Sequence, residues 1–248
     1  MDIIIKERFL ELWKRFFGNA EFPIVFYYSD VESDAEYAGK SEKWNCFIGQ
    51  LAKVRKGKSL AFDREAISCS GGKRCSGFSD KLRPGFEYFL SCGNAEIEGE
   101  RYLQSPELVK KFLKNTSWIP AKGAKIVFKR WDKLLEEDEP EVVIFFAKPD
   151  VLAGLFTLAG FDSEDFNGTI APFGSGCASI VQHPLAESKK EKPKAVLGMF
   201  DVSARPYVQE NLITFAIPIK RLEEMVSFME ESFLVTNSWE KVRGRINR

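Results

Sequence analysis

The stretch VVIFFAKPDVLAGLFTLAG, residues 142–160, indicates the fold class of the chain. Residues 142–147 form a continuous apolar run, which is typical of a strand buried on both faces of a sheet. Pro149 then begins a helix that we expect to reach about Leu158 and to end near Gly160. A buried strand followed at once by a helix is the repeating unit of an α/β fold.

Strands and helices continue to alternate after this stretch. We expect strands at 169–173, 195–200 and 212–217. A helix follows Gly176 to about Gln182, where Pro184 ends it, and Pro218 begins a long final helix whose apolar face reaches Phe233.

The first half of the chain carries the same kinds of pattern less regularly. Apolar spacing predicts an N-terminal helix over 2–17 stopped by Gly18, and a helix over 44–56. Ser105 is expected to cap a helix that Pro106 begins. Strands are expected at 23–28, 59–62 and 125–131, and the acidic run 136–139 is expected to be a solvated turn.

Together these elements predict one α/β domain spanning 1–248, with a mixed, partly parallel sheet flanked by helices. The order of elements repeats in outline, which suggests pseudo-repeat halves at 20–115 and 125–235. In each half a cysteine, Cys46 or Cys177, stands near the start of a helix. This pattern hints at an ancient duplication.

Composition excludes several classes of protein. The chain has 248 residues, with 36 Lys and Arg against 36 Asp and Glu, so it lacks the charge excess expected of a nucleic-acid binder. No apolar run is long enough to span a membrane, and the N-terminus has no signal-peptide pattern. We therefore expect a cytoplasmic protein with no nucleic-acid or membrane partner and with reduced or metal-bound thiols.

A loop dense in Cys, Gly and Ser is expected at 68–79. Gly71 and Gly72 allow tight turns that uncover backbone N–H groups, and Lys73 and Arg74 add positive charge. Such a loop suits an anion or a pair of thiolates. The spacing of a nucleotide-binding loop is absent, and a glycine-rich turn packed on the core explains the pattern equally well.

The segment Gly174-Ser175-Gly176-Cys177 lies between a strand and a helix, where open α/β sheets bind ligands. There the helix dipole is expected to lower the pKa of the Cys177 thiol. The alternative is a small residue buried in the core. His183, the one histidine, is six positions further along the expected helix, so its side chain should point away from Cys177.

The five cysteines are Cys46, Cys69, Cys75, Cys92 and Cys177, and they include no C-x2-C pair. Three of them stand at helix starts or in the glycine-rich loop, which makes Cys46, Cys69 and Cys177 the candidate metal ligands. Candidate ligand-binding residues are Gly71, Gly72, Gly174, Gly176 and Arg205. Arg205 is expected to pair with Asp201 or to hold a carboxylate or phosphate.

Cys46, the Cys69-x-Gly71-Gly72 segment with Gly77-Phe78, Gly176-Cys177, and LGMFDVSAR at 197–205 resemble the uncharacterised ArCR-like family of bacteria and archaea, a domain of unknown function. The resemblance extends from about residue 20 to 240. It implies a soluble protein with no assigned activity. It also implies a fourth cysteine near position 199, where this chain has Met199 and Phe200. Either Cys75, Cys92 or Asp201 replaces that cysteine, or the site binds something else.

Three functions remain open from the sequence. The first is a small-ligand or cofactor-binding protein whose pocket is lined by cysteines and glycines, in its sharpest form a site for an iron–sulfur cluster or a thiolate-bound metal. The second is a metal-free thiol enzyme that uses Cys177. The third is a non-catalytic interaction or regulatory module in which the cysteines belong to the core.

Overall fold

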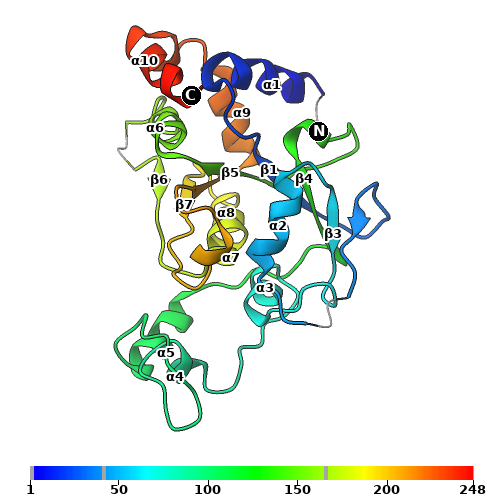
Figure 1. Cartoon of the computed structure of the whole chain (residues 1–248), viewed down its shortest axis with the longest axis vertical. Coiled ribbons are helices and arrows are strands. Elements are labelled where there is room, and N and C mark those ends of the chain that lie inside the picture. Colours follow the sequence, from blue (N-terminus) through cyan, green and yellow to red (C-terminus); the bar gives the residue numbers. More distant parts are fainter. Residues whose placement is uncertain (1–2, 41–42, 165–166, 248) are drawn as a thin grey trace.

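The computed structural model describes residues 3–40, 43–164 and 167–247. These residues form one eight-stranded sheet with the order β2-β3-β4-β1-β5-β8-β7-β6 (Figure 1). The strands are β1 (Ile24–Ser29), β2 (Glu36–Tyr37), β3 (Leu60–Phe62), β4 (Lys125–Arg130), β5 (Val142–Ala147), β6 (Thr169–Ile170), β7 (Ala195–Gly198) and β8 (Ile213–Pro218). The pairs β2–β3 and β6–β7 are parallel and the other neighbours are antiparallel, which confirms the predicted mixed sheet.

The strand order has an internal two-fold symmetry. The strands β1, β2, β3 and β4 correspond to β5, β6, β7 and β8. Read inward from either edge of the sheet, the order of corresponding strands and their parallel or antiparallel pairing are the same. The centre of symmetry lies between β1 and β5, where Val25 pairs with Val143. The matching halves are 24–130 and 142–218, so β4 belongs to the first half and not, as the sequence suggested, to the second. Descent of the halves from a duplication stays a prediction.

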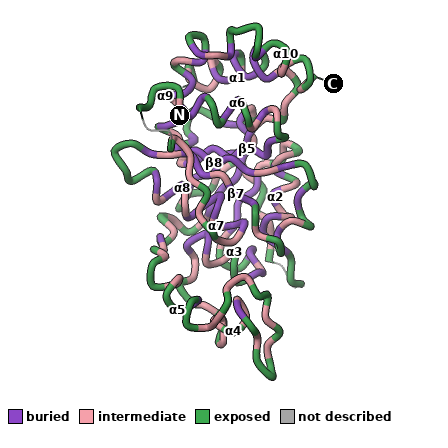
Figure 2. The backbone as a smooth tube through the Cα atoms, turned by 90° about the vertical axis from the view of Figure 1, so that its left-hand side faces the viewer, coloured by how far each residue is buried: buried purple, intermediate pink, exposed green. Residues whose placement is uncertain are grey.

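Helices cover both faces of the sheet, which gives three layers (Figures 1 and 2). One face is covered by α2 (Phe47–Arg55), α3 (Ser70–Cys75), α7 (Gly176–Ile180) and α8 (Gln182–Glu187). The other is covered by α1 (Ile3–Phe17), α6 (Pro149–Leu158), α9 (Ile219–Ser227) and α10 (Asn237–Ile246). The run at 142–147 is buried at every position because its alternate side chains enter the two cores, as with Phe145 and Phe146.

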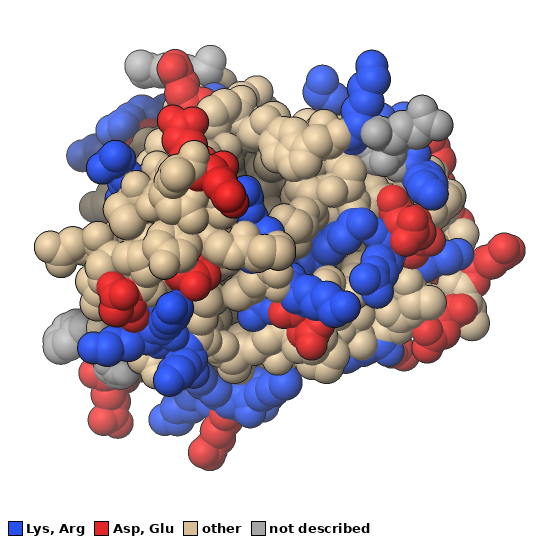
Figure 3. All heavy atoms as spheres, turned by 90° about the horizontal axis from the view of Figure 1, so that it is seen from below, with Lys and Arg blue, Asp and Glu red and all other residues tan. Residues whose placement is uncertain are grey.

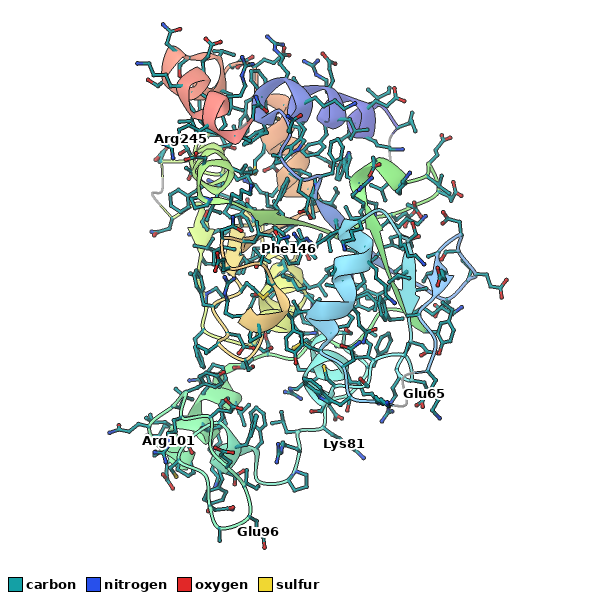
Figure 4. All side chains as sticks on the ribbon, in the orientation of Figure 1. Glu65, Lys81, Glu96, Arg101, Phe146 and Arg245 are labelled. Atoms are coloured by element: carbon teal, nitrogen blue, oxygen red, sulfur yellow. The ribbon has the colours of Figure 1, made fainter. Side chains whose placement is uncertain are left out.

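Residues 79–118 form a lower lobe that projects from the body below α3 and α7 (Figure 1). The lobe carries α4 (Phe86–Phe89) and α5 (Pro106–Asn115), with Ser105 capping α5 as expected. Figure 4 shows Lys81 where the chain leaves the body and Glu96 and Arg101 within the lobe, while Phe146 lies in the sheet. Short 3-10 turns complete the described elements: η1 (Trp131–Lys133), η2 (Arg205–Tyr207) and η3 (Phe233–Val235).

Three helix predictions need correction. The loop expected at 68–79 contains the helix α3. The helix expected from Gly176 to Gln182 breaks at Val181, and Pro184 lies inside the first turn of α8, where a missing N–H is tolerated. The helix that follows Pro218 ends at Ser227, so Phe233 lies beyond it in η3.

The acidic run at 136–139 is not wholly solvated, because Asp138 is buried. The Lys129 ammonium, which is fully buried, lies 2.7 Å from Asp138 Oδ2 and also contacts Asp34. The Tyr27 hydroxyl and the Leu135 N–H donate to the same carboxylate. These hydrogen bonds compensate the two buried charges for the loss of water. Asp138 therefore forms a structural ion pair with Lys129 of β4.

Replacing Lys129 with Met removes the ammonium group that faces a buried carboxylate. We expect Lys129→Met to lower the free energy of unfolding by about 3–5 kcal/mol. Lys58→Met is the control, because Lys58 pairs with Glu36 on the surface, and it should change stability by less than about 1 kcal/mol. Urea unfolding measures both, and equal effects would contradict the structural role of the buried pair.

Candidate functional site

Four of the five cysteines come together on the α2/α7 side of the sheet. Cys46 immediately precedes α2, Cys69 precedes α3, Cys75 ends α3, and Cys177 is the second residue of α7. All four belong to one buried cluster, and each keeps between 7% and 9% of its surface exposed. We call these four residues the thiol cluster. All four cysteines are buried, close to the surface of the core on this face of the sheet.

The contacts within the cluster centre on the first turn of α7. The thiols of Cys75 and Cys177 share a hydrogen bond, and Ser175 Oγ lies 3.3 Å from Cys75 Sγ. Cys69 Sγ accepts hydrogen bonds from the N–H groups of Gly72, at 3.1 Å, and of Phe47. Cys46 and Cys69 lie close enough to act electrostatically on Cys177. The three cysteines chosen from the sequence are therefore brought together, and Cys75 joins them.

Cys92 is not part of the cluster. It lies exposed in the lower lobe, between α4 and α5, and its thiol donates to the carbonyl of Gly93. Cys75, Cys92 and Asp201 were the residues considered in place of the fourth cysteine. Of these three, Cys75 is the one whose sulfur belongs to the thiol cluster. All five thiols are free.

The environment of the cluster separates the pKa values of its thiols. Hydrogen bonds from Cys177 and Ser175, with the charge of Arg74, lower the pKa of Cys75 in spite of its burial. The hydrogen bond with Cys75, burial and the neighbouring thiols raise the pKa of Cys177 well above the ordinary value. Burial also raises the pKa of Cys69. The prediction that the helix start would lower the pKa of Cys177 is therefore wrong, because the hydrogen bond with Cys75, burial and the neighbouring thiols together raise it.

Three of the four candidate glycines, Gly72, Gly174 and Gly176, lie in closely packed surroundings. A Cβ on Gly72 would come within 2.8 Å of Cys69 Sγ and of the Phe47 side chain, whereas Gly71 faces open space. In the second segment, a Cβ on Gly174 would meet His183 Nε2 at 2.9 Å. Contact of any of these glycines with a ligand stays a prediction.

Asp201 holds the start of α7. Its carboxylate accepts hydrogen bonds from the Gly176 N–H at 3.0 Å, from the Ser203 N–H and from the Ser203 hydroxyl. It also contacts the Tyr102 hydroxyl of the lower lobe. Arg205 does not pair with it. The Arg205 guanidinium instead donates to the carbonyls of Leu212 and Glu210, so its expected role in holding an anion stays a prediction.

His183 is the second residue of α8, the helix that follows the one carrying Cys177. The break at Val181 separates it from the helix of Cys177, contrary to the continuous helix expected from the sequence. Its Nε2 is buried against Gly174 and has no hydrogen-bond partner among the described residues. Burial lowers the pKa of His183, with Glu187 opposing the shift, so the imidazole is neutral at pH 7.

Two residues at the cluster were not singled out from the sequence as functional. The Gln182 side chain donates to the carbonyls of Cys75 and Ile119 and accepts the N–H of Ile119, which fixes the end of α3. Met199 is buried against Gly176 with a positive φ of 69°. Only the resemblance had drawn attention to Met199, as a position that lacks the expected cysteine.

The cluster is not a preformed site for a single ion. Within 3–40, 43–164 and 167–247, no three His, Cys, Asp or Glu side chains are placed to hold one metal ion. Two surface hollows, of about 380 and 640 Å³, lie elsewhere: the first beside α6, lined by Leu152 and Phe156, and the second beside Gly18. A pocket lined by these cysteines stays a prediction, and the four thiols themselves lie buried in the core on this face of the sheet.

The surface seen from below carries basic and acidic side chains in mixture (Figure 3), as the balanced charge of the chain leads one to expect. No helix in the part of the chain that the structure describes is long and apolar enough to cross a membrane.

An α/β protein with four clustered thiols is the class that the fold and the site define. A family profile described as uncharacterised ArCR, a domain of unknown function, matches residues 14–227, and the chain belongs to this family. No curated protein and no solved structure matched the chain.

Adjacent glycines test how tightly α3 is packed against the cluster. Gly72→Ala places a methyl group against Cys69 and Phe47, and we expect it to destabilise the fold by about 1–3 kcal/mol. Gly71→Ala, one position earlier, meets open space and should be neutral or stabilising by about 0.4–1 kcal/mol. Thermal unfolding of the two variants compares them, and equal stability would contradict the packing.

The hydrogen bond from Cys177 is the largest cause of the lowered pKa of Cys75. Cys177→Ala should therefore move the midpoint of Cys75 alkylation to higher pH, because the thiolate loses its donor. Iodoacetamide labelling followed by mass spectrometry across a pH series measures this midpoint. An unchanged midpoint would show that the two thiols do not interact.

Proposed function

We propose that the thiol cluster, Cys46, Cys69, Cys75 and Cys177, binds a thiophilic metal, either as a single ion or as an iron–sulfur cluster. The observation that carries the proposal is the convergence of four cysteines, distant in sequence, on the starts of α2, α3 and α7 and the end of α3. Buried free cysteines are common singly, but a group of four thiols acting on one another is the arrangement that sulfur-ligated metals require.

The donor set fits a soft metal. Its members are all sulfur, while the nearby Asp201 carboxylate is engaged by backbone and hydroxyl donors. Burial raises the pKa values of Cys69 and Cys177, so in the metal-free protein these thiols keep their protons. A bound cation replaces those protons, which couples binding to proton release and to the stability of the fold.

Among the described residues, no three side chains are already placed to ligate one metal ion. Metal binding therefore requires the thiols to turn toward one point. A change of χ1 from one staggered well to another is the movement that would turn a thiol toward that point. An iron–sulfur cluster, being larger than a single ion, would hold its four thiolates further apart and needs less rearrangement. A reducing compartment such as the cytoplasm would keep the thiols available for either group.

Purification without oxygen tests the proposal. We expect the isolated protein to contain iron, zinc or copper, with acid-labile sulfide and visible absorption if the group is an iron–sulfur cluster. Serine at Cys75 or Cys177 should lower the metal content severalfold, because each supplies one of few ligands. Cys92→Ser is the matched control, since Cys92 lies exposed in the lower lobe, and it should leave the content unchanged.

A protein that contains no metal and that takes up none when iron and sulfide, Zn²⁺ or Cu(I) is supplied would contradict the proposal. So would equal loss of metal in the Cys92→Ser control and the cluster variants.

The hydrogen-bonded Cys75–Cys177 pair favours a second candidate, a metal-free thiol enzyme. In that case Cys75 is the nucleophile, in place of the Cys177 expected from the sequence, because Cys75 accepts hydrogen bonds that stabilise its thiolate. Rapid labelling of Cys75 in a protein that binds no metal supports this candidate. If neither metal nor selective labelling is found, the cysteines belong to the core of an interaction module.

A further inference from the structure

Cys75 and Cys177 form a pair of thiols within the thiol cluster. They belong to α3 and α7, two helices that lie next to each other in both views of the fold (Figures 1 and 2). The two thiols share a hydrogen bond, and the Ser175 hydroxyl, two residues before Cys177, lies 3.3 Å from Cys75 Sγ. Both cysteines are free, so the two sulfur atoms are in contact without a covalent bond between them.

The polar groups around Cys75 favour its thiolate. Ser175 Oγ accepts the N–H of Ala178 at 3.2 Å as the cap of α7, and its own hydrogen remains for Cys75. The charge of Arg74 acts on the same sulfur, and with the two hydrogen bonds it lowers the pKa of Cys75 in spite of burial. The thiolate is the reactive form of cysteine, so Cys75 is the nucleophile of the pair.

Cys177 has the opposite character. Its raised pKa means that it keeps its proton at pH 7. A protonated thiol in contact with a reactive thiolate is placed to capture the oxidised form of that sulfur as a disulfide. Cys69 instead accepts hydrogen bonds from the backbone N–H groups of Gly72 and Phe47, so the contacts pair Cys177 with Cys75.

Burial limits the size of an oxidant that reacts with this pair. Cys75 and Cys177 are each 7% exposed, which favours a small molecule over a bulky organic hydroperoxide. Arg74 and Ser175 beside them are half-buried hydrogen-bond donors, and donors suit an oxidant whose oxygen atoms accept hydrogen bonds. Hydrogen peroxide has both properties.

We propose that Cys75 and Cys177 form a redox site that hydrogen peroxide converts to an intramolecular disulfide. The Cys75 thiolate attacks one oxygen of the peroxide, the O–O bond breaks, and the departing hydroxide takes up a proton from the solvent. Cys75 is then a sulfenic acid. The Cys177 sulfur attacks the Cys75 sulfur, the S–O bond breaks, and the hydroxyl group leaves as water with the proton of Cys177. The two thiols lose two electrons, and the peroxide gains them to become two water molecules.

This redox reaction goes beyond the proposed function, because it requires no bound metal. It also affects the proposed metal site, since a disulfide removes two of the four cysteine ligands. Oxidation of the pair and binding of a metal by all four thiolates therefore exclude each other.

Peptide mapping of the oxidised protein tests the inference. The full-length reduced protein, treated with a chelator, is exposed to a small excess of hydrogen peroxide, and the remaining thiols are blocked before digestion without reductant. We expect the five free thiols to fall by two per chain and a peptide linked through Cys75 and Cys177 to appear before exposed Cys92 is oxidised. In Cys177→Ser, dimedone should trap a sulfenic acid at Cys75. Cys92→Ser is the matched control and should form the disulfide as the wild type does.

The mapping of the wild type needs no variant and decides the claim by itself. A disulfide between any other two cysteines, or loss of Cys75 to sulfinic acid without a disulfide, overturns the inference. The same disulfide in a chain that takes up no metal supports the inference and contradicts the proposed function. A chain that binds metal and forms no Cys75–Cys177 disulfide overturns the inference and leaves the proposed function standing.

Discussion

The pairing of β1 with β5 at the centre of the sheet is the constraint on which the other features depend. This antiparallel contact joins two halves of equivalent topology, and it places the symmetry centre between Val25 and Val143. Because the relation is a two-fold rotation about an axis perpendicular to the sheet, the equivalent helices α2 and α7 lie on the same face. Their starts carry Cys46 and Cys177, so the symmetry itself brings two of the four thiols toward each other.

The remaining thiols come from an insertion into this symmetry. The short helix α3 follows β3 and places Cys69 at its start and Cys75 at its end, and the equivalent place after β7 is occupied by Met199 and the turn at Asp201. The cluster is therefore asymmetric, and the asymmetry sets its electrostatics. The pKa of Cys177 is raised and that of Cys75 is lowered, so one thiol of the pair is a poor thiolate and the other a favoured one.

Much of the fold follows from local patterns. The apolar runs of β1, β5 and β8 predict buried strands because both faces of the sheet are covered, and Gly18 ends α1 with the left-handed φ that its position requires. The two residues of the edge strand β2 are exposed, and the strand is defined by its backbone pairing with β3. The side-chain pattern of the sequence therefore does not predict it. The burial of Asp138 depends on Lys129 arriving from another strand, which local composition does not reveal.

The candidate site was predictable only in part, for related reasons. Cys46, Cys69 and Cys177 stand at helix starts, and helix starts in α/β folds gather at one side of a sheet. The inclusion of Cys75 depends on α3 being a helix, which the Gly71-Gly72 pair disfavours by propensity and which packing against Cys69 and Phe47 nevertheless supports. The burial of Met199 depends on its contact with Gly176 of α7, which no spacing in the sequence encodes.

The central claim is that the four buried thiols act as one unit. Alkylation of each cysteine, followed by mass spectrometry with and without one equivalent of Cd²⁺, measures this most directly. The account predicts that Cd²⁺ slows the labelling of Cys46, Cys69, Cys75 and Cys177 together and leaves exposed Cys92 unaffected. Four labelling rates that ignore the metal, or protection of Cys92 with the others, would contradict it.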